Sequence, residues 1–330
     1  MDTVSSDVIV KVDDRVRLLS TLLAATRFPD DEWQRNPHGS HLHARATRKR
    51  LADYDGQAAA LSLQAQLDGQ TPLDALFAAI LTLKLPDFRF SGNDRFPDVF
   101  AEELQAFFNN ADLQAWWDSE PDWQQSASDM NRLLEGMALK SFFHPFFGDI
   151  PETLVLMPNI LYPSDQEITL RFEDQLIVIV PPRVAWGESP PWPYGEDPAH
   201  VYRAAIQNFG ALLMREYLQN HSSKLAEVSQ TSLPLNETLL TLFPTWEAQF
   251  TNIFCAAAVA LYLEDHVSAR EANAFALMER KTRGIDILPA AISVLRRYRS
   301  DLALGKYREL ADFLPVFPKQ LKLATRIKAL

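Results

Sequence analysis

The stretch YRAAIQNFGALLMREYL, Tyr202 to Leu218, decides how the fold of this chain is interpreted. Apolar residues recur on nearly every side of it, which is typical of a buried helix. We therefore predict a central helix near residues 198–221. The centre of that helix carries a polar amide pair, Gln207 and Asn208, which is unusual in such surroundings.

The residue pattern changes from helical to β-forming in the segment that precedes this helix. The segments ETLVLMPNILYP, EITLRF and QLIVIVPP are short, rich in β-forming residues and separated by turn residues. They predict a small antiparallel sheet around residues 151–181, and VIVKV at residues 8–12 predicts one further short strand. Helical patterns dominate up to about residue 148 and resume near residue 197.

This order of elements predicts an α+β fold that is mostly helical, with the small sheet packed over the central helix. We expect a single unit over residues 1–330. Its N-terminal helical half is residues 1–148, and residues 149–330 hold the small sheet and the C-terminal helical half. The chain has 330 residues, of which 47% are apolar, and this is enough to build a sizeable core.

The charge balance narrows the range of partners. The formal net charge is −11, and such an acidic surface argues against nucleic acid and anionic membranes as partners. No apolar run approaches the roughly 18 residues of a membrane helix, and the N-terminus lacks the pattern of a signal peptide. These features predict a cytoplasmic protein. The single cysteine, Cys255, lies in an apolar helix, so we expect a buried and unreactive thiol.

Several phrases of the sequence, taken in their order, resemble a family of bacterial zincin-like proteins, metallopeptidases of the gluzincin type. They are VDDRVRLLSTLLAAT, TPLDALFAAILTL, FFHPFFG, FPTWEAQFTNIFCAAAVALYL and the tail that begins with ERKTRGIDILPAA. In zincins, the two histidines of an HExxH helix bind zinc and the glutamate between them activates a water. A third ligand comes from a following helix. The resemblance spans most of the chain and implies a zincin-like fold.

Aligned with this family, the zinc motif falls on Gln207-Asn208-Phe209-Gly210-Ala211, and the third ligand falls near Asn252. The resemblance thus implies that amides and a methyl group replace the ligands and the general base. Amides are poor zinc ligands, and an amide such as Asn208 is not a useful base near neutral pH. We therefore expect no catalytic residue, no metal and no cofactor. The chain is expected to be a catalytically inactive relative of zinc metallopeptidases.

Two other interpretations stay open. In the first, Gln207 and Asn208 only form hydrogen bonds to a neighbouring loop or to the sheet edge, and the chain is a structural or partner-binding helical protein. In the second, it is a hydrolase with an unrecognised metal or acid–base set. The histidines of HGSHLH, residues 38–43, lie beside four basic residues, which predicts a solvated loop and helix start and not a metal site.

The loop WGESPPWPYG, residues 186–195, leads into the central helix and would border the cleft of a zincin-like body. Aromatic side chains on such a loop suit the binding of a peptide or protein. The alternative is that they plug the emptied cleft. The residues that we expect to line this cleft are Trp186, Trp192, Tyr194, His200 and Arg203.

Overall fold

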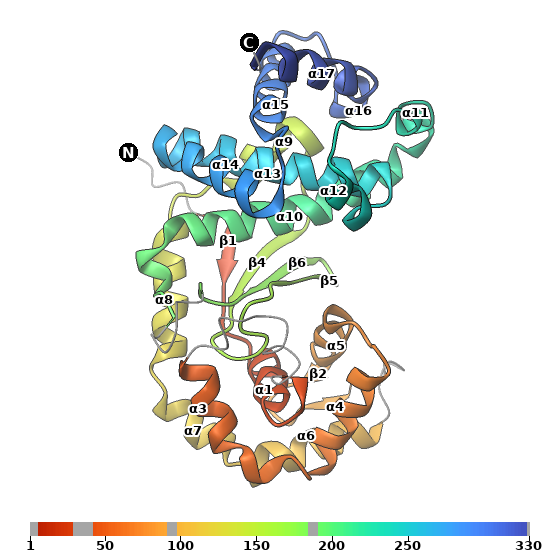
Figure 1. Ribbon diagram of the computed structural model, residues 1–330. Coiled ribbons are helices and arrows are strands. Elements are labelled where there is room, and N and C mark those ends of the chain that lie inside the picture. Colours follow the sequence, from red (N-terminus) through yellow and green to blue (C-terminus); the bar gives the residue numbers. More distant parts are fainter. Residues whose placement is uncertain (1–5, 29–41, 91–97, 184–190, 329–330) are drawn as a thin grey trace. The chain divides into compact units, whose positions relative to one another are not determined.

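The computed structural model describes residues 6–28, 42–90, 98–183 and 191–328. It divides the chain into two compact units, each built from separate stretches of sequence (Figure 1). The sheet unit consists of Val8–Gly136 and Glu152–Val201. The helical unit consists of Met1–Asp7, Met137–Pro151 and Tyr202–Leu330.

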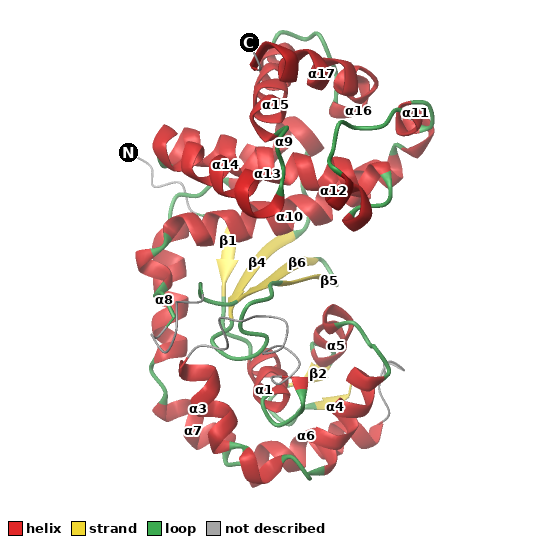
Figure 2. Cartoon of the chain, viewed as in Figure 1, coloured by secondary structure: helices red, strands yellow, loops and turns green. Residues whose placement is uncertain are grey.

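The sheet unit combines four strands of one sheet, a small hairpin and seven described helices (Figure 2). The sheet strands are β1 (Val8–Val10), β4 (Thr153–Pro158), β5 (Ile168–Phe172) and β6 (Gln175–Val180), and the hairpin is β2 (Leu83–Lys84) with β3 (Arg89–Phe90). The helices are α1 (Asp14–Leu23), α3 (Leu42–Arg50), α4 (Ala58–Asp68), α5 (Leu73–Ile80), α6 (Asp98–Asn110), α7 (Leu113–Ser119) and α8 (Asp122–Leu134), with short 3-10 turns η1 (Ala52–Tyr54) and η2 (Tyr194–Glu196).

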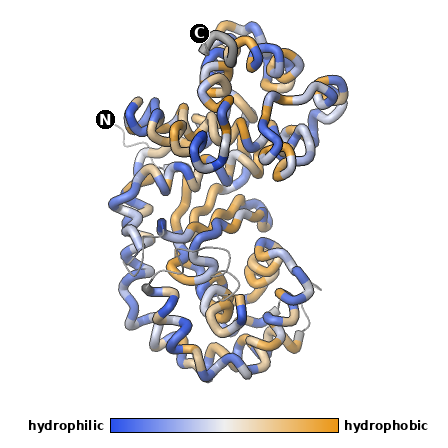
Figure 3. The backbone as a smooth tube through the Cα atoms, viewed as in Figure 1, coloured by the Kyte–Doolittle hydropathy of each residue, from blue (hydrophilic) through white to orange (hydrophobic). Residues whose placement is uncertain are grey.

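The sheet is mixed, so the prediction of an antiparallel sheet is wrong. Its order is β1-β4-β6-β5. The β1–β4 and β4–β6 pairs are parallel, and only β5 and β6 form an antiparallel pair. The physical reason is visible in β4 and β6, whose apolar residues run on without alternation and are buried on both faces (Figure 3). Continuous apolar strands are typical of parallel pairing.

The core of the sheet unit lies between the sheet and α1, with α5 packed on β5. Helix α1 begins after Asp13, whose side chain accepts a hydrogen bond from the Arg15 backbone and so caps the first turn. Leu18 and Leu22 on this helix have no exposed surface. Burial of each such side chain contributes about 1.5–3 kcal/mol. On the other side of the unit, α8 contacts β1 and β4.

The helical unit is built from long helices and short turns. Its elements are α9 (Leu139–Phe147), α10 (Pro198–Asn220), α11 (Ser222–Leu225), η3 (Val228–Gln230), α12 (Glu237–Leu242), α13 (Trp246–His266), α14 (Ala269–Arg283), α15 (Leu288–Ala303), α16 (Leu310–Phe313), η4 (Leu314–Val316) and α17 (Phe317–Lys328). The predicted central helix is confirmed as α10. The boundary between the two units falls inside it, after Val201.

Aromatic side chains hold the helical unit together. Phe146 on α9 packs edge-on against Phe254 on α13, and Tyr298 on α15 donates a hydrogen bond of 2.8 Å to the Pro145 carbonyl. Helices α10 and α13 meet at Gly210, where an added Cβ would lie 3.6 Å from the Cys255 sulfur. The predicted helical majority and α+β class are therefore confirmed.

Three finer predictions about the fold remain predictions. The sheet and most of α10 belong to different units, so the packing of the sheet over this helix stays a prediction, as do the single unit and the zincin-like fold. Among the described residues, no helix is both long enough and apolar enough to span a membrane.

Candidate functional site

The amide pair of α10 is half-buried and engaged within its own helix. Asn208 Nδ2 donates a hydrogen bond of 2.8 Å to the Ala204 carbonyl, one turn earlier. Gln207 Oε1 accepts from Arg203 Nη1 at 3.4 Å, again across one turn. These distances place an arginine, and not a metal ligand, beside the first position that the resemblance assigns to zinc.

The same pattern recurs at the other two ligand positions. The Ala211 carbonyl accepts a hydrogen bond of 3.1 Å from Arg215 Nε. On α13, Asn252 Oδ1 accepts from Arg283 Nη2 at 2.6 Å. Arg283 is fixed in turn by Glu279 at 2.8 Å. A guanidinium group is therefore bonded to the side chain at two of the three positions, Gln207 and Asn252, and to the backbone carbonyl at Ala211.

The Cys255 thiol is buried in the helical unit. Burial raises its pKa to about 12, although the charges of Arg215 and Arg283 oppose the shift. The expected burial of Cys255 is confirmed. A thiol with such a pKa holds almost no thiolate at neutral pH and is a poor nucleophile. Within the described residues, no group of three or more His, Cys, Asp and Glu side chains is arranged to hold a metal ion.

A pocket of ≈ 430 Å³ lies in the sheet unit, at the carboxyl ends of β4 and β6. Ile160 follows β4 and Pro182 follows β6, and both line it. The carboxyl ends of parallel strands are a common place for ligands in α/β sheets. We call this hollow the strand-end pocket. Its lining consists of His43, Ala46, Asp122, Gln125, Ser126, Asp129, Ile160, Pro182, Pro191, Trp192, Pro193 and Tyr194.

Two buried polar residues shape the strand-end pocket. Asn159 is 1% exposed and directly follows β4; its side chain donates to the Tyr162 carbonyl and accepts from the Leu161 backbone, both at 3.1 Å. The Tyr194 hydroxyl donates a hydrogen bond of 2.6 Å to the Val180 carbonyl at the end of β6. Burial raises the pKa of Tyr194 well above its ordinary value, so this hydroxyl stays protonated as a donor.

One face of α8 forms the polar wall. Asp122, Gln125, Ser126 and Asp129 follow the i, i+3, i+4, i+7 spacing that places side chains on one side of a helix. The Asp129 carboxylate accepts hydrogen bonds from Gln125 at 2.9 Å and from Arg132 at 3.0 Å.

The loop of the aromatic residues approaches this face closely at Gly195. A Cβ there would lie 2.6 Å from Arg132 Nη2 and 3.1 Å from the Asp129 carboxyl carbon. A larger residue at position 195 would require the exposed Arg132 side chain to move aside and would press on the Asp129 carboxylate.

His43 lies between two carboxylates on the rim of the strand-end pocket. Its Nε2 is 3.4 Å from Glu120 Oε2, and its Nδ1 is 3.6 Å from Asp122 Oδ2. Burial alone would raise the pKa of Glu120, but His43, the Trp116 indole and Arg17 outweigh it, so the pKa is lowered from its ordinary value. Glu120 is therefore an anion at neutral pH. The expected helix start is confirmed, because α3 begins at Leu42, but the His43 side chain is only 17% exposed and lies beside Glu120, which follows α7, and Asp122, which begins α8. His38 and His41 lie outside the described residues.

The residues predicted to line the cleft lie in different parts of the structure. Trp192 is half exposed and Tyr194 is buried, and both line the strand-end pocket. His200 Nε2 lies 2.9 Å from the Pro181 carbonyl, and Arg203 belongs to the helical unit. Trp186 lies outside the described residues. The prediction missed the acidic face of α8, although its spacing is readable in the sequence.

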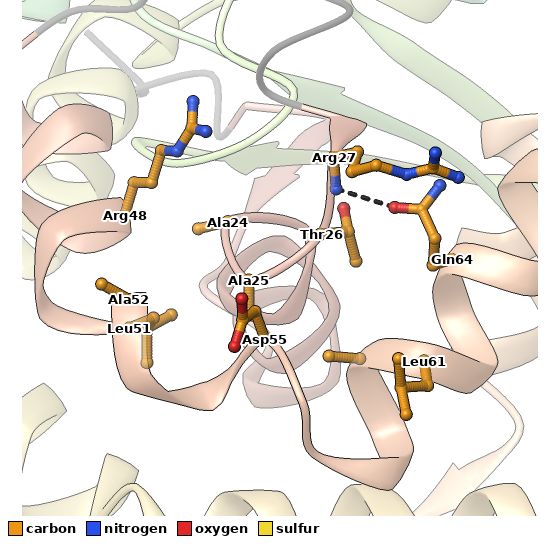
Figure 4. A pocket seen from close by; sticks show the side chains of 11 residues that line it. Ala24, Ala25, Thr26, Arg27, Arg48, Leu51, Ala52, Asp55, Leu61 and Gln64 are labelled. Atoms are coloured by element: carbon orange, nitrogen blue, oxygen red, sulfur yellow. Dashed lines mark hydrogen bonds between the residues drawn. The ribbon is translucent and has the colours of Figure 1, made fainter.

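A second hollow of ≈ 390 Å³ lies where α1 ends, between α3 and α4. Figure 4 shows Arg27 and Gln64 on its wall, joined by a hydrogen bond of 2.7 Å from the Arg27 backbone. The Arg27 guanidinium is paired with Asp68 at 2.6 Å. Arg27 and Gln64 therefore already have partners within this hollow and beside it.

Comparison of the chain with protein-family models, with curated proteins and with solved structures finds no match.

Proposed function

We propose that the chain is a non-catalytic relative of zincin-type metallopeptidases that acts by binding a peptide or protein segment. The observation that carries this proposal is the guanidinium group bonded to the side chain of each of Gln207 and Asn252. A dication at such a place would face several positive charges. At about 5 Å and an effective dielectric constant of about 20, each guanidinium would repel it by several kcal/mol.

The strand-end pocket supports the part of the proposal that concerns the binding of a peptide or protein segment. Pockets of about 300–1,000 Å³ with aromatic and apolar walls and a few polar groups are typical ligand sites. The ring of Trp192, 50% exposed, gives a peptide a surface to pack on. The net charge of −11 supports a partner other than nucleic acid.

The test combines metal content with peptide binding. We expect elemental analysis of the purified protein to find no stoichiometric zinc, and a peptide library to yield ligands whose binding changes tryptophan fluorescence. Trp192→Ala should weaken binding about tenfold or more, because interface aromatic residues often carry 1.4 kcal/mol or more (roughly a factor of ten). Trp192→Phe is the matched control and should retain most of the affinity. Stoichiometric zinc that is lost in Gln207→Ala would contradict the proposal.

A hydrolase with an acid–base set is the second candidate function. The observation that favours it is the placement of both His43 ring nitrogens beside carboxylates on a pocket rim. On this candidate, His43→Gln should lower the hydrolysis of blocked peptides and esters by about 100-fold or more, the usual share of a general acid or base. Glu120→Gln should shift the pH profile of the remaining activity. Wild-type protein that hydrolyses nothing faster than buffer would remove this candidate.

A further inference from the structure

We infer that the strand-end pocket is specific for a positively charged group on an aliphatic stem, the chemistry of a lysine or arginine side chain. This inference rests on the proposed peptide-binding function and names the class of residue that the pocket would take. It follows from three features of the wall: its charge, its unused hydrogen-bond acceptors and its apolar side.

The charge of the lining is negative. The Asp122 carboxylate is 67% exposed, and His43, at 3.6 Å, is its sole ion-pair partner among the described residues. Asp129 adds a second carboxylate, which Arg132 partly offsets from a position outside the lining. Among the described residues of the lining there is no lysine or arginine. Asp122 is therefore the group that an incoming cation would meet.

The α8 face also carries an acceptor without a partner. Ser126 is 8% exposed and lines the pocket, and its hydroxyl has no hydrogen-bond partner in the part of the chain that the structure describes. An ammonium or guanidinium group has donors to spare and no acceptor. Such a ligand group would complete the hydrogen bonding of Ser126 and Asp122, which lie one turn apart.

The opposite wall suits the stem of such a side chain. It consists of Ile160, three prolines and the partly exposed ring of Trp192. Lysine and arginine side chains pack their methylene groups on apolar surfaces while the charged end stays with polar groups. A cation beside the face of a tryptophan gains further attraction from the ring. The two walls therefore match the two ends of one basic side chain.

The test measures the fluorescence response to capped pentapeptides that differ only at the central residue. Peptides with a central Arg or Lys should bind about tenfold tighter than the Gln peptide, as a charge-assisted contact beside an aromatic ring allows. The Glu peptide should bind most weakly. Free agmatine carries the guanidinium and the aliphatic stem without a peptide. Its binding therefore shows whether the pocket takes a side chain of a peptide or a free amine. Agmatine that binds as tightly as the Arg peptide would overturn the assignment to a peptide.

Substitution of Asp122 provides a second, independent test of the inference. Asp122→Asn should abolish the preference for Arg over Gln and leave binding of the Gln peptide unchanged. Asp53→Asn, at an exposed acidic residue of η1 outside the pocket, is the matched control and should change neither. Equal binding of the Arg and Gln peptides to the wild-type protein would overturn the charge inference while peptide binding stands. Failure of every peptide to bind would overturn the proposed function as well.

Discussion

An Asn159→Ala variant is expected to lose about 2–4 kcal/mol of unfolding free energy, because one buried side chain satisfies two backbone groups. Asn159 has almost no exposed surface, and it bonds the Tyr162 carbonyl and the Leu161 backbone N–H. Alanine would leave both groups buried without these partners. The turn after β4 carries Ile160 into the pocket wall, so we also expect peptide binding to fall.

Urea denaturation followed by tryptophan fluorescence checks this prediction. Asn131→Ala is the matched control, since Asn131 is exposed on α8 and its side chain bonds within its own helix. We expect the control to stay within about 0.5 kcal/mol of the wild type, as most surface substitutions do. Equal stability of the two variants would show that the Asn159 bonds do not hold this turn.

The second large effect, a change in zinc affinity, is expected from building the zinc site that the resemblance implies. The quadruple variant Q207H/N208E/A211H/N252E places the family's ligands on α10 and α13. We expect it to bind zinc only weakly, because the positive charges of Arg203 and Arg283 remain beside two of these positions. Removal of both arginines by Arg203→Gln and Arg283→Gln should tighten zinc binding by about 100-fold or more, given repulsion of several kcal/mol for each nearby charge.

Two additions make the zinc experiment decisive. Glu279→Gln belongs in the same variant, because Glu279 is 4% exposed and would lose its Arg283 partner. Competition with a chromophoric chelator measures the affinity. The arginine and Glu279 substitutions without the four ligands are the control and should bind no zinc. If the complete variant keeps its circular dichroism spectrum and still binds no zinc, the assignment of the former ligands is wrong.

Local patterns predicted most elements of the fold. The strands at 153–158, 168–172 and 175–180 and the helix at 198–220 follow from residue type and spacing. The pairing of the strands did not follow, because parallel partners are far apart in sequence. Residues 8–10 pair with residues 154–156, and no turn joins them. The uninterrupted apolar runs of β4 and β6 were the available signal.

The candidate site was predictable only in part. Trp192 and Tyr194 were expected at a binding surface because aromatic residues on a proline-rich loop suggest one, and both line the strand-end pocket. His43 was missed, since its basic sequence neighbours suggested a solvated loop, whereas its acidic neighbours in space come from α7 and α8. The strand-end pocket lies at the carboxyl ends of two parallel strands. The prediction of an antiparallel sheet therefore gave no reason to expect it.

The interleaving of the two units has a consequence for how the chain is made. The backbone passes from one unit to the other at four places, after residues 7, 136, 151 and 201. Strand β1 leaves the ribosome early, but its hydrogen-bonded neighbour β4 emerges only after eight described α-helices have been synthesised. Because domains fold as their parts become available and long-range strand pairing is slow, the sheet unit cannot close before residue 180 is translated. No cut at a single point in the gene would release either unit whole.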